Sequence, residues 1–148
     1  MPIGVGTPRR STLPDLEAAL AYARATFPAW RPAALGSSYS AAFVFLLAAR
    51  HPSDVSAVLA FSPGEYLSGA SVAAAAAARV GAPVYVTSAS NAGEEAAAAI
   101  LAASPAQVKR QTRARVGAHG TATLRADSNP EGAAANFSDV AAWLAALP

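Results

Sequence analysis

Short apolar runs alternate along this chain with longer alanine-rich segments, and this alternation limits the possible folds more than any single motif does. Runs such as "PVYVTSA" and "DVSAVLAF" have the length and composition of buried strands. Successive parallel strands need a long crossover, usually a helix, to connect them. The pattern therefore predicts an α/β fold of three layers: a mostly parallel sheet of about four strands with helices on both faces. The predicted strands are residues 30–37, 54–61, 83–89 and 106–116, and the predicted helices are residues 13–27, 40–50, 71–80, 94–104 and 133–147.

Length and composition exclude several classes of protein. The 148 residues suit one domain, residues 13–148, preceded by an N-terminal arm, residues 1–12. With no cysteine and two histidines, disulfides, thiol catalysis and Cys- or His-rich metal sites are ruled out, and we expect neither metal nor cofactor. No run reaches the ~18 apolar residues of a membrane span, and no signal peptide is recognisable. We therefore expect a soluble cytoplasmic protein without a membrane partner.

The charge of the chain gives no reason to expect a nucleic-acid partner. The formal net charge is only +2. One local basic cluster is explained equally well by solvated residues on an edge strand. It consists of Lys109, Arg110, Arg113 and Arg115.

A serine-rich turn, "LGSSYS", joins a predicted buried strand to a predicted buried helix. A nucleophilic serine on such a turn needs small residues two positions before and after it, because the backbone folds sharply there. Gly36 and Ser40 meet this requirement around Ser38. The competing interpretation is structural, since serine is a preferred helix N-cap.

His119 lies between two glycines in the loop "VGAHGTATL", after the last predicted strand. Loops that follow parallel strands gather at the carboxyl edge of the sheet, so His119 could act as general base for Ser38. His51, at the end of a helix, is interpreted as structural.

The acidic partner of the histidine is ambiguous in the sequence. Glu94 or Glu95 could orient the imidazole from the loop after the third strand, although Glu94 also forms a capping-box pattern with Asn91. Glu65, after the second strand, is a rival, and Asn91 could take the same place without a charge. The chain order serine, acid, histidine, each after a successive strand, favours a catalytic interpretation over any single motif.

These segments resemble the C-terminal half of an α/β-hydrolase, closest to the dienelactone-hydrolase-like esterases. The matching motifs are "LGSSYSAA", "FSPGEYL", "PVYVTSA…GEE" and "GAHGTATL". The resemblance implies a truncated α/β-hydrolase fold in which Ser38 is the nucleophile, His119 the base and Glu94 the acid. It also implies that the Tyr39 N–H supports the oxyanion.

The chain departs from this family by lacking the strands that normally precede the serine turn and the loop that gives a second oxyanion donor. The serine strand would then form an exposed sheet edge, which either the N-terminal arm, residues 1–12, or a second subunit would cover, and we expect a homodimer. The predicted function is a serine esterase acting on short, accessible acyl esters. The alternatives are a degenerate hydrolase remnant that binds a partner, and a flavodoxin-like domain whose serine loop holds a phosphate.

Overall fold

The computed structural model describes residues 12–68, 71–89 and 91–148, with only the backbone at 91 and 92. Within these ranges helices and strands alternate as the sequence predicts. The strands are β1 (Ala33–Ser37), β2 (Ala57–Phe61), β3 (Val84–Ser88) and β4 (Lys109–Arg113). The helices are α1 (Thr12–Thr26), α2 (Tyr39–Arg50), α3 (Val72–Ala77), α4 (Asn91–Ala103), the 3-10 helix η2 (Gly120–Leu124) and α5 (Ala133–Ala145).

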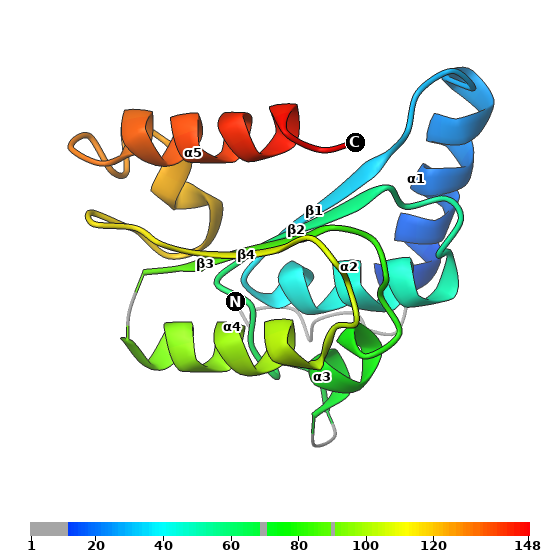
Figure 1. Ribbon diagram of the computed structural model, residues 1–148, viewed down its shortest axis with the longest axis horizontal. Helices are drawn as coiled ribbons and strands as arrows, with labels where there is room; N and C mark the ends of the chain where they lie inside the picture. The colour runs from blue at the N-terminus through cyan, green and yellow to red at the C-terminus, as the bar shows by residue number, and fades with distance from the viewer. Residues whose placement is uncertain (1–11, 69–70, 90) are drawn as a thin grey trace, which may run out of the picture.

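The four strands form one parallel sheet in the order β1-β2-β3-β4, so the predicted three-layer α/β fold is confirmed. Crossovers between parallel strands share one hand, and each strand here is added on the same side of the one before it. The three crossover helices α2, α3 and α4 therefore lie on the same face of the sheet, with α1 beside α2 (Figure 1). The other face is left to α5, which the chain reaches only after the last strand (Figure 1).

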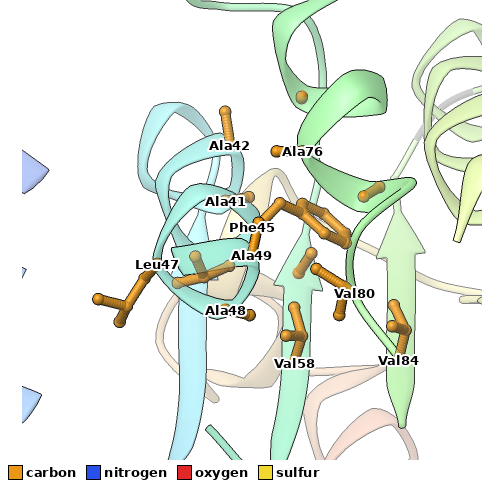
Figure 2. Packing of buried hydrophobic residues seen from close by; sticks show 14 of the residues in the cluster. Ala41, Ala42, Phe45, Leu47, Ala48, Ala49, Val58, Ala76, Val80 and Val84 are labelled. Carbon is orange, nitrogen blue, oxygen red and sulfur yellow. The ribbon is translucent and has the colours of Figure 1, made fainter. Parts of the chain in front are cut away.

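The larger core lies between the sheet and the crossover helices. Strand residues such as Val58 and Val84 are fully buried there against alanine-rich helices, whose small side chains allow a close approach. Figure 2 shows Phe45 of α2 lying between α2 and α3, above Val58. The poly-alanine segments therefore belong to the packed core.

The smaller core, on the opposite face, supports only the middle of the sheet. Trp143 of α5 packs on Tyr85 of β3, with ring centroids 5.4 Å apart, and buried Leu59 of β2 belongs to the same cluster. Leu35 of β1 is in register with Leu59 but remains 52% exposed. The strand that leads into the serine turn is therefore an edge strand with an uncovered apolar side chain, as expected from the sequence.

Other differences from the predicted elements are small. Helix α1 begins at Thr12, one residue earlier than predicted, and the rest of the N-terminal arm lies outside the described residues. Strand β4 is shorter than predicted and holds Lys109, Arg110 and Arg113 at the second sheet edge. The segment 120–124, predicted as loop, is the 3-10 helix η2. No helix in the described ranges has the length and apolarity needed to cross a membrane.

Candidate active site

The turn between β1 and α2 holds Ser38 in a strained conformation. Ser38 has φ 55° and ψ −120°, a combination that L residues rarely adopt. The turn is tight because α2 starts immediately after it: a Cβ on Gly36 would lie 2.5 Å from the carbonyl oxygen of Ser40. The Ser40 hydroxyl accepts from the Ser37 N–H at 2.8 Å and donates to the Ser37 carbonyl at 2.9 Å. Ser40 thus stabilises the turn.

The side chain of Ser38 does not cap α2, although Ser38 occupies the N-cap position. Its Oγ instead lies 2.7 Å from Nε2 of His119, a residue 81 positions away in the chain. Ser38 is half-buried and His119 is exposed, so the pair lies at the surface. The structure therefore brings together the two residues on which the catalytic interpretation depends.

His119 is carried by a loop that follows β4, which we call the histidine loop (residues 114–124). The Gly120 N–H donates to Ser62 Oγ at 2.9 Å, and the Thr121 N–H donates to Ser37 Oγ at 3.0 Å. Gly120 has φ +62°, and a Cβ there would lie 2.2 Å from Ser37 Oγ. Only glycine fits this position without strain.

Two buried asparagines brace the histidine loop from the α5 side. The Asn129 side-chain amide donates to the carbonyls of Val116 and Thr123, at 3.1 and 2.9 Å. The Asn136 amide donates to the same carbonyls, at 2.9 and 3.1 Å. Neither residue was predicted from the sequence, although Asn136, a polar residue on the buried face of the closing helix, carries a recognisable signal.

The imidazole of His119 has no carboxylate partner. All nine Asp and Glu residues of the chain lie in the described ranges, and none of them hydrogen-bonds to His119. Glu65 instead receives the N–H groups of Ala73 and Ala74, at 2.7 and 2.8 Å, and so caps α3. Glu95 is exposed on α4. The side chain of Asn91, the uncharged candidate, lies outside the described part.

Glu94, the expected acid, pairs with an arginine and not with the histidine. Its carboxylate pairs with Nε of Arg113 at 3.2 Å, and its carbonyl accepts from the side-chain amide of Gln111 at 3.0 Å. Both partners belong to β4, so Glu94 joins α4 to the edge of the sheet. The expected contact between Glu94 and His119 is not formed.

The remaining predicted site residues lie where the sequence placed them. Tyr39 is the first residue of α2, so its N–H belongs to the positive end of the helix macrodipole, next to Ser38. His51 lies at the far end of α2, where its Nε2 is 3.1 Å from the Glu17 carboxylate of α1. This hydrogen bond, together with Arg50, lowers the pKa of Glu17. His51 thus connects two helices, which fits the structural interpretation.

Chemically, the site offers a hydroxyl on a rigid turn, an imidazole in position to take its proton, and a helix N-terminus beside both. In the described ranges, no cluster of three or more His, Cys, Asp or Glu side chains could hold a metal ion. A separate cavity of about 220 Å³ lies between α1 and β1, but only apolar residues line it, so it offers no reactive group.

Comparison with known proteins adds no assignment. No protein-family model matches the chain, and no curated protein matches it significantly.

Proposed function

We propose that this chain is a small serine hydrolase, of the carboxylesterase type, that cleaves short and accessible acyl esters. The observation that carries the proposal is the 2.7 Å contact between Ser38 Oγ and His119 Nε2. The strained backbone of Ser38 adds support, because such strain is found mainly at functional sites. The resemblance of the serine turn and the histidine loop to dienelactone-hydrolase-like esterases is consistent with it.

The proposed reaction uses a Ser–His dyad. Ser38 Oγ attacks the ester carbonyl carbon as its proton passes to His119 Nε2, and the carbonyl oxygen becomes an oxyanion. The Tyr39 N–H and the N-terminus of α2 stabilise this charge. The C–O bond to the alcohol then breaks, and His119 returns the proton to the departing oxygen. Water, deprotonated by His119, then attacks the acyl carbon. The bond to Ser38 Oγ breaks as His119 returns the proton to that oxygen, which releases the carboxylic acid and free Ser38.

The site supports a slow enzyme. Loss of the acid from a catalytic triad lowers turnover by about 10⁴, and loss of one oxyanion donor lowers it by about 10²–10³. Removing an entire triad still leaves residual catalysis over water. Because turnover is slow, the best substrates should be activated esters with good leaving groups. With such esters acylation is faster than deacylation, so the acyl-enzyme should accumulate.

The test is p-nitrophenyl acetate hydrolysis together with labelling by a fluorophosphonate probe, which reacts only with an activated serine. The wild-type protein should release p-nitrophenol with a burst and carry the probe on Ser38. The Ser38→Ala variant should lose both the p-nitrophenol burst and the labelling by the probe. Ser71→Ala is the matched control, because Ser71 also has a positive φ (58°) at a helix N-terminus and makes no side-chain cap bond. Activity that is equal in wild type and Ser38→Ala would refute the proposal.

A second candidate is favoured by the edge of the sheet rather than by the serine. Leu35 is 52% exposed on β1, and the apolar cavity between α1 and β1 lies beside it. A degenerate hydrolase that binds a partner through this edge would show neither burst nor labelling. The same two measurements therefore separate the candidates.

A further inference from the structure

We propose that Ser62 and Ser37 are positioning residues that keep His119 against Ser38 in place of a carboxylate. This inference rests on the proposed function and extends it by naming what orients the base. In a complete triad the acid holds the imidazole in its reactive orientation. Here the ring has no acidic partner, so its placement must come from the backbone that carries it.

The two serines hold consecutive N–H groups of the histidine loop, directly after His119. Ser62 Oγ accepts from Gly120 at 2.9 Å, and Ser37 Oγ accepts from Thr121 at 3.0 Å. The first serine follows β2 and the second ends β1. The loop is therefore fastened at two points to the same sheet edge that carries Ser38.

Ser62 is itself held in place by two hydrogen bonds of its backbone and by burial of its side chain. Its N–H donates to the Thr87 carbonyl of β3 at 2.6 Å, and its carbonyl accepts from the Tyr66 hydroxyl at 3.1 Å. Its side chain is buried, with only 5% of the residue exposed. A hydroxyl held this firmly can transmit the geometry of the sheet to the loop.

Ser62 and Ser38 occupy equivalent positions on neighbouring strands. Ser37 pairs in register with Phe61, so Ser38 and Ser62 each follow their strand at the same level, and the Ser38 N–H donates to the Phe61 carbonyl at 2.8 Å. Both serines have a positive φ, 55° and 51°. Ser62 takes no part in the reaction steps, but from this strained position its hydroxyl accepts from the N–H that follows the base.

The geometry matters because proton transfer depends steeply on distance. A displacement of about 1 Å can lower turnover about a hundredfold. His119 is exposed, and within the histidine loop it lies between two glycines, which add conformational freedom to the backbone. Asn129 and Asn136 hold the two ends of the loop from the α5 side, but the two serine contacts are the hydrogen bonds that join the Gly120 and Thr121 amides to the sheet.

The first experiment compares the kinetics of Ser62→Gly, Ser62→Ala and Ser37→Ala with those of wild type. Ser62→Gly removes the hydroxyl without penalising the positive φ, so it keeps the test valid if Ser62→Ala folds poorly. We expect kcat to fall about 10- to 100-fold in Ser62→Gly, with KM within about twofold and a parallel loss in the rate of fluorophosphonate labelling.

Ser104→Ala is the matched control for lost stability. Ser104 is also buried, donates to the Val80 carbonyl at 2.7 Å, and precedes β4 at the opposite end of the sheet. It should keep the wild-type kcat. An unchanged kcat in Ser62→Gly, or an equal fall in Ser104→Ala, would overturn the inference.

The second experiment does not depend on activity. Hydrogen exchange of the Gly120 amide should be about two- to tenfold faster in Ser62→Gly, as expected for one hydrogen bond of usual net strength, and that of Thr121 faster in Ser37→Ala. If wild type proves unreactive, the proposed function fails. Unchanged exchange in both variants would instead refute the holding role of the serines, whatever the activity.

Discussion

Gly120→Ala and Ser37→Ala should not have additive effects on stability, because both changes break the same hydrogen bond. A Cβ on Gly120 would lie 2.2 Å from Ser37 Oγ, whereas the next nearest atoms, Ser37 Cβ and Ser38 N, would be 3.5 and 3.8 Å away. The overlap is relieved only if the Ser37 hydroxyl leaves the Thr121 N–H. In Ser37→Ala that hydroxyl is already gone, and the new methyl group has room.

The magnitudes follow from this geometry. An alanine at φ +62° costs about 1–2 kcal/mol in left-handed strain. The lost hydrogen bond costs about 1 kcal/mol. Gly120→Ala should thus destabilise by about 2–3 kcal/mol and Ser37→Ala by about 1 kcal/mol. The double variant should lose about 2–3 kcal/mol rather than the sum, giving a coupling of about 1 kcal/mol.

Urea unfolding of the four proteins measures this coupling. Distant sites add within about 0.5 kcal/mol, so the expected value is resolvable. Gly81→Ala is the control, because a Cβ there meets no atom within 4 Å, and it should be neutral or slightly stabilising. Additive effects at positions 37 and 120, or a Gly120→Ala variant as stable as Gly81→Ala, would refute the described packing of the histidine loop on β1.

Two further predictions concern Glu94 and the sheet edge. Glu94→Gln should leave the rate of ester hydrolysis within about twofold of wild type. It should lower the free energy of unfolding by about 1 kcal/mol or less, because the pair with Arg113, whose side chain is 77% exposed, is weak. A loss of activity near 10⁴ would show that Glu94 orients the base after all. Light scattering at micromolar concentration should show that the wild-type protein is a homodimer, because β1 is an edge strand and Leu35 is 52% exposed. Leu35→Glu should convert the dimer to a monomer. A monomeric wild type would contradict this prediction.

The fold could be predicted because its signals are local. Strands β2 and β3 are buried at all five positions, and each lies within an apolar run of the sequence. Helix propensity and the stop signals of proline and glycine placed the helices to within a few residues. The 3-10 helix η2 was missed, since five residues of "GTATL" are too short to show any period.

The contact between Ser38 and His119 could also be predicted, because chain topology alone brings the carboxyl ends of parallel strands to one edge. The acid could not be predicted in this way. Its position depends on where one side chain points, and Glu94 turns toward Arg113 on β4 rather than toward the histidine. No sequence pattern distinguishes the two orientations of a glutamate at the start of a helix.

Ser62 shows what a search for a complete triad overlooks. A serine directly after a buried strand and before a proline looks like a turn residue, and the register with Ser38 becomes visible only once the strands are paired. Since none of the nine carboxylates hydrogen-bonds to His119, we infer that neutral hydrogen bonds to its backbone orient the base. Such bonds can fix the position of an imidazole, but they cannot stabilise the positive charge that it gains. A correctly assembled dyad and a low turnover are therefore expected together in this protein.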